Sequence, residues 1–250
     1  MDKTTELTQV TDLATNAAAD ARERRGAAVW MKIVLAQKLL NTAAQRFWCG
    51  ESVARRLPSF LLELYSMVRC SVPLMTAAFE RASELAADDP LAAIAAAYLE
   101  RHIREERHHD EWLLDDMAFA GLDRAEVQGR APSANVARLI GAQYCWMRHA
   151  HPAALFGYLA VIEGNPPLPR HLAEIQSVSG YPPEVFRCLH QHAADDIEHL
   201  TELRATIMEL PLSESNAALI SMSALATLEG LVDIFESLEQ EGQGQLTHIC

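Results

Sequence analysis

The spacing of apolar residues is the feature that most constrains how this sequence folds. Apolar residues recur at steps of three and four in Ala- and Leu-rich segments that proline and glycine interrupt, and this period is typical of amphipathic helices. Alternation with a period of two is not sustained anywhere, and the Asn-Gly and Asp-Gly pairs of tight hairpins are absent. The sequence therefore predicts an all-α protein.

The helices follow each other without a segment that resembles an interdomain linker, so we expect a single domain over residues 1–240 and a flexible C-terminal tail over 241–250. Asp88 and Asp89 before Pro90 predict an N-cap, and Pro73 predicts a kink or a split. A division into two helical domains near 122–132 is the weaker alternative, because the candidate site below needs both halves. The expected helices are 5–24, 27–48, 58–71, 73–87, 90–119, 133–149, 152–163, 168–178, 183–209 and 214–239, with a short element at 123–130.

The composition excludes several classes of partner. Lys and Arg number 21 against 34 Asp and Glu, which gives a net charge of −13, and so acidic a chain repels nucleic acid. The N-terminal MDKTTELTQV lacks the features of a signal peptide, and no apolar stretch reaches the roughly 18 residues of a membrane span. Five cysteines lie scattered without a CxxC pair. We therefore expect a cytoplasmic protein that binds neither nucleic acid nor a membrane.

A first polar stripe lies in YLERHIREERHHDEWLLDDM. His102, Glu105, Glu106 and His109 occupy positions i, i+3, i+4 and i+7, so an unbroken helix would carry all four on one face. Apolar residues continue the same face. The stripe is therefore predicted to lie within a surface that would otherwise belong to the core.

A second stripe, in LHQHAADDIEHLTEL, repeats the spacing with His192, Asp195, Asp196 and His199. A lone histidine on an apolar face is usually a hydrogen-bonded core residue. Two matched stripes on separate helices instead favour a shared metal site, because buried carboxylates and imidazoles are costly unless they are paired or bound to a metal. Imidazole and carboxylate together suit iron, manganese or zinc.

A third contribution comes from HPAALFGYLAVIEGNPP, where ten largely apolar residues after Pro152 precede Glu163. Alone, Glu163 is equally well explained as a solvent-facing helix end. Beside the two stripes it is the best candidate for a bridging carboxylate. Six protein ligands are too many for one catalytic metal with an open position, and they suit two ions that share a bridge. The candidate ligands are Glu106, His109, Glu163, His192, Asp196 and His199.

At these residues the sequence resembles the heme-oxygenase-like diiron oxidases and oxygenases, a family of iron-containing redox enzymes. The matching elements are Glu106-x-x-His109, then Glu163, then His192-x-x-x-Asp196-x-x-His199, and the resemblance covers residues 25–210. It implies a heme-oxygenase-like bundle of about seven core helices plus short extra helices. It also implies a non-heme centre of two iron ions per chain, Fe(II)/Fe(III), with O₂ as co-substrate.

The sequence departs from the family pattern at one position. Some members carry a carboxylate seven residues before the histidine of the first motif, where this chain has His102. Either Glu106 is the carboxylate of this segment, or His102 is an additional ligand, or Glu105 takes part. Heme degradation in the fold uses an axial histidine on the first helix, and the first hundred residues contain no histidine. We therefore expect no heme.

The resemblance implies oxidation of a small-molecule substrate. The reactions known in the family are N-oxygenation of an amine or amino acid, and oxidative C–C cleavage or desaturation of an amino acid or fatty acid. Two alternatives stay open. One is a ferritin-like diiron carboxylate protein, which would repeat Glu-x-x-His twice. The other is a non-catalytic helical scaffold in which the side chains of the two stripes only form hydrogen bonds with each other. The apolar segments 27–44 and 214–236 also predict a homodimer.

Overall fold

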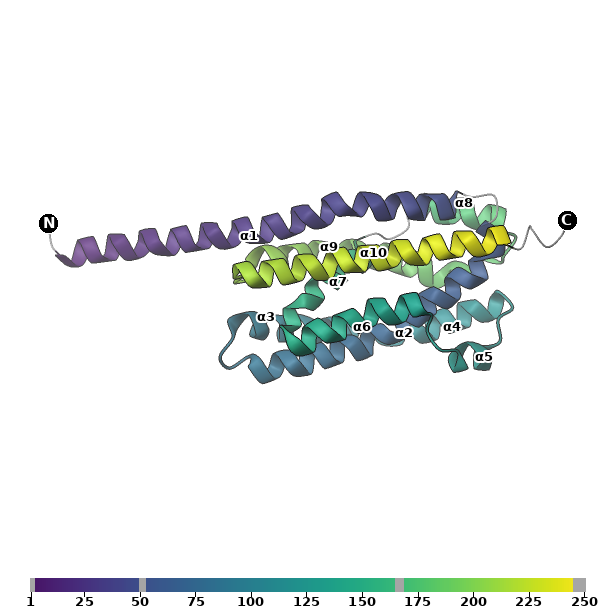
Figure 1. Ribbon diagram of the computed structural model, residues 1–250, viewed down its shortest axis with the longest axis horizontal. Helices are drawn as coiled ribbons and strands as arrows, with labels where there is room; N and C mark the ends of the chain where they lie inside the picture. The colour runs from purple at the N-terminus through teal and green to yellow at the C-terminus, as the bar shows by residue number, and fades with distance from the viewer. Residues whose placement is uncertain (1–2, 50–52, 165–168, 245–250) are drawn as a thin grey trace.

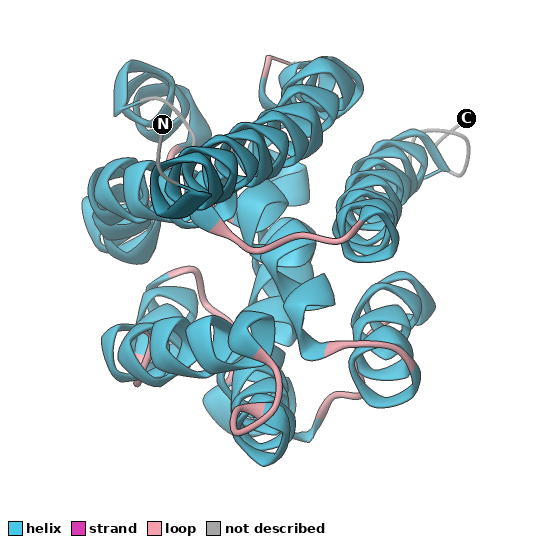
Figure 2. Cartoon of the chain, turned by 90° about the vertical axis from the view of Figure 1, so that its left-hand side faces the viewer, coloured by secondary structure: helices cyan, strands magenta, loops and turns pink. Residues whose placement is uncertain are grey.

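The long helices of this protein run side by side along one axis (Figures 1 and 2). The computed structural model describes residues 3–49, 53–164 and 169–244, with the backbone alone over 3–20 and 241–244. These ranges contain ten α-helices, two 3-10 segments and no strand, which confirms the all-α prediction. Residues 241–244 of the predicted tail continue the last helix, and 245–250 lie outside the described residues.

The helices have the following bounds: α1 Lys3–Trp48, α2 Val53–Leu85, α3 Pro90–Glu105, α4 His109–Phe119, α5 Arg124–Gly129, α6 Ala134–His149, α7 Leu155–Ile162, α8 Pro169–Ser179, α9 Arg187–Glu209 and α10 Glu214–Gly244. The 3-10 segments η1 (Pro152–Ala154) and η2 (Pro183–Phe186) precede α7 and α9. Helices α1, α9 and α10 pack together on one side, and α2 packs with α3, α4 and α6 on the other (Figure 1).

Helix α7 lies at the centre of the bundle. Every residue from Leu155 to Val161 is buried, and the helix packs against α10, α9, α1 and α6. A helix that is apolar all round must be covered on every side. The long helices in Figure 2 surround it, and its C-terminal end places Glu163 inside the protein.

The start of α3 is tied to the segment that leads into α7. As predicted, Asp89 caps α3 and accepts a hydrogen bond from the Leu91 amide at 2.8 Å. The Ala153 amide donates to Nδ1 of His151 at 3.0 Å, so its Nε2 carries the proton toward Oδ2 of Asp89, also at 3.0 Å. This connection fixes α3 relative to α7, and both helices lead into the candidate site.

Two expected helix breaks are absent. The predicted helices 5–24 and 27–48 form the single helix α1. Gly26 does not end a helix there but allows α1 to pack closely against α9. A Cβ at Gly26 would lie 2.6 Å from the Ile207 carbonyl oxygen in α9. The predicted split at Pro73 is also wrong. Helix α2 continues through it, and the adjacent Leu74 and Met75 are buried against the core.

One unexpected break occurs, within the predicted helix 90–119. Helix α3 ends at Glu105 and α4 begins at His109, because His108 adopts the left-handed conformation with φ of 73°. No glycine or proline marks this position in the sequence. The first polar stripe is therefore divided between two helices.

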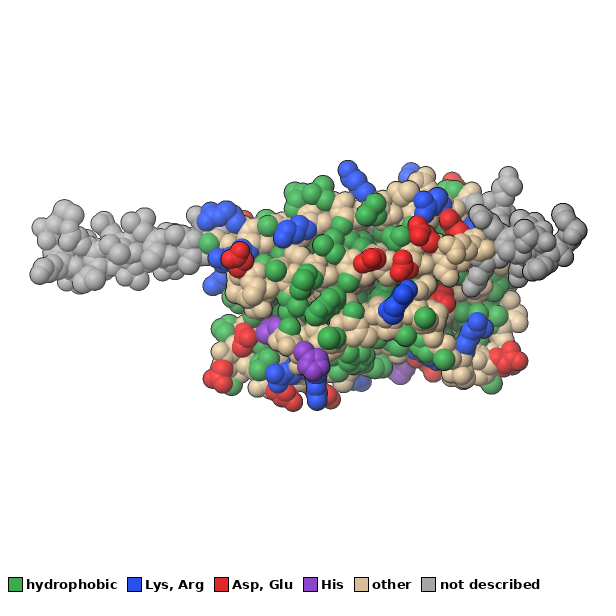
Figure 3. All heavy atoms as spheres, in the orientation of Figure 1, with side chains coloured by type: hydrophobic (Ala, Val, Ile, Leu, Met, Phe, Trp, Pro, Cys, Tyr) green, Lys and Arg blue, Asp and Glu red, His purple; other side chains and the backbone are tan. Residues whose placement is uncertain are grey.

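One described helix is long and apolar enough, by length and composition, to cross a membrane. The segment Glu214–Gln240 of α10 has a mean hydropathy of 1.6 in its most apolar window, so the expectation that no stretch reaches this length is wrong by that measure. Buried core helices meet the same criterion, and α10 packs against α1, α6 and α7. Hydrophobic side chains also lie on the face shown in Figure 3, over α1 and α10. Leu35 and Leu39 of α1 and Met222 of α10 are among the exposed large hydrophobic residues.

Candidate metal centre

The first group of metal-ligand side chains contains His102 and Glu105 from α3 and His199 from α9, whose ligand atoms all lie within 4.8 Å of one another. Oε2 of Glu105 lies 3.5 Å from Nδ1 of His102 and 3.7 Å from Nε2 of His199. The two imidazole rings meet edge to face at 4.9 Å. This group thus presents two nitrogens and one carboxylate to a common point.

The second group contains Glu106, His109 from the start of α4 and His192 from α9, again within 4.8 Å. Nδ1 of His109 lies 2.9 Å from Oε2 of Glu106 and 3.2 Å from Nε2 of His192. Its composition, two imidazoles and one carboxylate, repeats that of the first group. The break at His108 allows His109 to turn toward Glu106.

The two groups adjoin and form one centre. Oε1 of Glu106, in the second group, lies 3.9 Å from Nδ1 of His199, in the first. The neighbouring residues Glu105 and Glu106 thus each serve a different group. Two adjacent sets of nitrogen and oxygen donors suit a pair of metal ions better than a single ion.

Glu163 is buried beside the first group, at 5% exposure. Its Oε1 lies 2.8 Å from Nε2 of His102, whereas its Oε2 is buried without a hydrogen-bond partner among the described residues. Nδ1 of His199 is similarly buried and unpaired. Buried polar atoms of this kind are rare in native proteins, and both have lone pairs that a cation would accept.

Asp196 is the most perturbed carboxyl group of the centre. Burial raises its pKa to about 8, and the negative charges of Glu163 and Glu106 add to the effect. Among the described residues, no Lys or Arg forms an ion pair with Glu106, Glu163 or Asp196. These carboxyl groups therefore lack a Lys or Arg partner, and a bound cation would stabilise their ionised form.

Hydrogen bonds to carboxylates and to a backbone carbonyl orient the histidines of the centre and shift the pKa values of the groups involved. Burial disfavours the charged form of His102, but the hydrogen bond and charge of Glu163, with the charges of Glu106 and Glu105, raise its pKa to about 9. Burial is the largest effect on Glu106 and opposes its ionisation, yet the hydrogen bond from His109 and the charges of His109, His102 and His192 together lower the Glu106 pKa. Nδ1 of His192 donates to the Cys188 carbonyl oxygen at 2.9 Å. That bond places the proton on Nδ1, so the lone pair of Nε2 can bind a metal.

The sequence-predicted ligands converge in space. The side chains of Glu106, His109, His192 and His199 belong to the two groups, Glu163 contacts His102, and Asp196 lies 4.0 Å from His199. His102 and Glu105, whose role the sequence left open, both belong to the first group. Asp195 of the second stripe does not join them and accepts hydrogen bonds from Gln191 instead.

Asp116 is a residue of the site's surroundings that the sequence reading missed. Its carboxylate is 1% exposed and accepts hydrogen bonds from the Cys188 amide at 2.6 Å and from Arg187 at 3.0 Å. These bonds hold the first turn of α9 against α4. The only signal in the sequence is an acidic pair inside the apolar run LLDDMAF.

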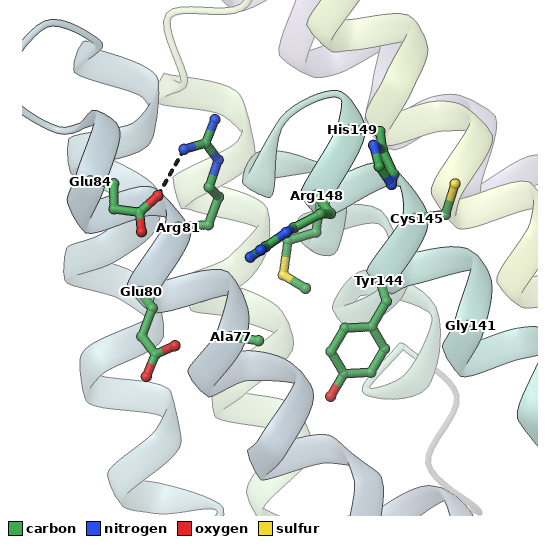
Figure 4. Close-up of a pocket in the computed structure, with 10 residues that line it drawn as sticks. Ala77, Glu80, Arg81, Glu84, Gly141, Tyr144, Cys145, Arg148 and His149 are labelled. Atoms are coloured by element: carbon green, nitrogen blue, oxygen red, sulfur yellow. Dashed lines mark hydrogen bonds and ion pairs between the residues drawn. The ribbon is translucent and has the colours of Figure 1, made fainter.

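A cavity of about 510 Å³ lies elsewhere, between α2 and α6 (Figure 4). The close-up shows side chains from both helices around it, with the Arg81–Glu84 ion pair at 2.8 Å on one wall. None of the candidate metal ligands lines it. The metal centre therefore does not lie in this cavity, despite the volume of the cavity.

The donor set fits iron. Four imidazoles and four carboxylates lie together in the clusters and their immediate neighbours, and nitrogen and oxygen donors in such a mixture are typical of non-heme iron and manganese sites. Neither group contains a thiolate, the ligand that would favour a structural zinc site.

Comparison with known proteins agrees with this fold and chemistry. The family model described as iron-containing redox enzyme matches residues 59–230. A domain of unknown function with a heme oxygenase-like fold from Shewanella denitrificans OS217 superposes with a TM-score of 0.69 at 18% identity, covering 88% of this chain and 91% of that one. A TenA homolog from Pseudomonas syringae pv. tomato DC3000 gives 0.60 at 14% identity, covering 82% and 91%. No curated protein matches the sequence.

Proposed function

Because the chain belongs to the family of iron-containing redox enzymes, we propose that it is a non-heme diiron oxidase or oxygenase that activates O₂. Its substrate is a small organic molecule. The reaction is N-oxygenation of an amine or amino acid, or oxidative C–C cleavage or desaturation of an amino acid or fatty acid. The heme-oxygenase-like fold is common to proteins of different function, so the proposal depends on the site.

The observation that carries the proposal is the pair of adjoining His/carboxylate groups. Beside them, the carboxyl groups of Glu106, Glu163 and Asp196 form no ion pair with any Lys or Arg of the described residues. The second group would hold one ion through Glu106, His109 and His192. The other ion would be held by His199, Asp196 and Glu163 together with the rest of the first group, His102 and Glu105. Bound iron supplies the electrons and the oxidising power for O₂ chemistry.

The protein's own groups orient and enclose the reaction. The Cys188 carbonyl oxygen fixes the ring of His192, and Glu163 fixes that of His102. The buried helix α7 closes one side of the centre and excludes water there.

Iron loading tests the proposal. After anaerobic incubation with Fe(II) and gel filtration, we expect about two irons per chain, and O₂ addition should produce a transient visible absorption band. His192→Ala should lose iron, whereas His190→Ala, on the exposed side of the same helix, should retain it.

Other outcomes would contradict the proposal. Uptake of many irons per chain would favour the ferritin-like alternative, and unchanged low iron content in the wild type and both variants would favour a helical scaffold. A cytoplasmic location, a homodimer and the absence of nucleic-acid and membrane partners remain predictions from the sequence.

A further inference from the structure

A second cavity, of about 270 Å³, opens between α4 and the start of α9. Its volume is just below the roughly 300–1,000 Å³ of drug-sized ligand sites, so it suits a smaller molecule. Asp116 and Cys188 are buried in its wall, whereas Trp112 and Arg187 remain exposed. The lining residues are Trp112, Asp115, Asp116, Arg187, Cys188 and Gln191.

This cavity shares a wall with the second group of the metal centre. The Trp112 ring lies 4.5 Å from the ring of His109, centroid to centroid. Sγ of Cys188 lies 3.4 Å from Nδ1 of His192. Two residues that line the cavity therefore contact two of the candidate ligands directly.

Arg187 carries a positioned guanidinium at this cavity. Nε and Nη2 both contact Oδ1 of Asp116 at 3.0 Å, and the guanidinium carbon lies 5.2 Å from the centroid of the Phe119 ring. Nη1 makes no hydrogen bond with any described residue. Because two contacts already restrict the side chain, its remaining donors are arranged before a ligand arrives.

The acidic groups of the cavity are already paired. Oδ2 of Asp116 accepts the Cys188 amide, and Asp115 forms an ion pair with Arg124 at 2.6 Å. Both carboxylates therefore have a cationic partner already, which weakens their attraction for a ligand ammonium group. Together the two negative charges also disfavour a dianion such as phosphate.

The geometry points to a binding site for a small monocarboxylate with an apolar body. The ligand carboxylate binds the free donors of Arg187, and its apolar part covers the exposed ring of Trp112. This inference rests on the proposed function, because it assigns the substrate class of the same centre. Among the substrates considered, it selects carboxylic acids over simple amines.

Three probes of similar size test the inference on the full chain: phenylacetate, 2-phenylethanol and phenethylamine. Binding is measured by equilibrium dialysis, without metal and after anaerobic Fe(II) loading. Nitrogen-15 spectra of the metal-free protein follow the indole signals of its four tryptophans. We expect phenylacetate to bind most tightly and to shift the Trp112 signal, which Trp112→Phe identifies.

Variants separate the site from the fold. Arg187→Gln should weaken phenylacetate binding about tenfold or more, as loss of a charge-assisted contact does, and should leave binding of 2-phenylethanol unchanged. Arg138→Gln, which removes an exposed arginine paired with Asp233 in another part of the bundle, should leave both unchanged. Trp112→Ala removes no buried group and should weaken binding of both probes.

The outcomes test the carboxylate site and the diiron proposal separately. Equal binding of the three probes, or equal phenylacetate binding by wild type and Arg187→Gln, would overturn the carboxylate site even if two irons load normally. Selective phenylacetate binding by a chain that takes up no iron would support the site and refute the diiron proposal. The two hypotheses therefore fail separately.

Discussion

His102 and Glu163 lie 2.8 Å apart, Nε2 to Oε1, and connect α3 to the end of α7 inside the bundle. Both side chains are almost fully buried. His102 therefore carries its proton in a buried position, where the Glu163 carboxylate is the partner that stabilises the charge. Removing either partner leaves an unpaired polar group in the core.

Glu163→Gln is expected to lower the pKa of His102 in the metal-free protein. Burial of His102 opposes its charge, and Glu163 contributes the largest opposing effect that raises its pKa to about 9. Without that carboxylate the pKa should fall by more than one unit, as measured by NMR titration of the imidazole. Glu105→Gln removes a more exposed and weaker contributor and should cause a smaller decrease. Equal decreases would show that Glu163 has no special role.

The metal-free protein should lose stability as the pH rises from about 6.5 to 9. The folded pKa of His102 is raised above its ordinary 6.5, so its stabilising contribution is complete below pH 6.5 and disappears as the pH passes 9. Asp196, with a pKa of about 8, also binds its proton more tightly in the folded state and acts in the same direction. Urea unfolding at several pH values measures this loss. Increasing stability over this range would contradict both assignments.

Iron binding should release protons at pH 7. Asp196, whose pKa is about 8, is largely protonated in the metal-free protein and must ionise to bind a metal. Calorimetric titrations with Fe(II) in two buffers of different ionisation enthalpy count the protons. Asp196→Asn should release about one fewer, whereas Glu198→Gln, exposed on the same helix, should match the wild type. An unchanged count in Asp196→Asn would exclude Asp196 as a ligand.

Much of the fold was predictable because helical periodicity and capping are local. The N-cap at Asp89 and the apolar segment that leads to Glu163 both follow from neighbouring residues. The errors at Gly26 and Pro73 have tertiary causes. Gly26 permits close approach of α9, and packing around Leu74 and Met75 keeps α2 continuous.

Gly157→Ala is expected to destabilise the protein by about 3 kcal/mol. Its added Cβ would meet the Ile220 carbonyl oxygen and would lie 2.7 Å from the Ala224 amide nitrogen, both backbone atoms of α10. Gly141→Ala, with no atom within 4 Å of the new Cβ, should instead stabilise α6 by about 0.5–1 kcal/mol. Thermal and urea unfolding compare them. Similar effects of the two substitutions would argue against close packing of α7 on α10.

His108→Gly should stabilise the protein by about 1 kcal/mol, because a non-glycine residue in the left-handed region is strained. The φ of His108 is 73° and its side chain is exposed, so iron content should not change. His108→Val should destabilise, since a β-branched residue tolerates this conformation less well. Denaturant unfolding with iron analysis measures both effects. A stabilising valine would indicate that α3 and α4 form one continuous helix.

The convergence of the candidate residues was predictable in part, but their arrangement was not. Matched spacing identified His109, His192 and His199 because helical periodicity places such residues on one face. The division into two groups depends on the backbone at His108 and on which imidazole nitrogen faces each carboxylate. Those contacts arise between helices far apart in the sequence, so spacing alone left His102 and Glu105 undecided.

The interruption at His108 has a mechanical consequence. In an uninterrupted helix, with its fixed rise of about 1.5 Å per residue, His102 and His109 would move as a single rigid rod. Here His102 travels with α3 and His109 with α4. A small shift of α4 would thus move His109 relative to His102, which a continuous helix would not permit.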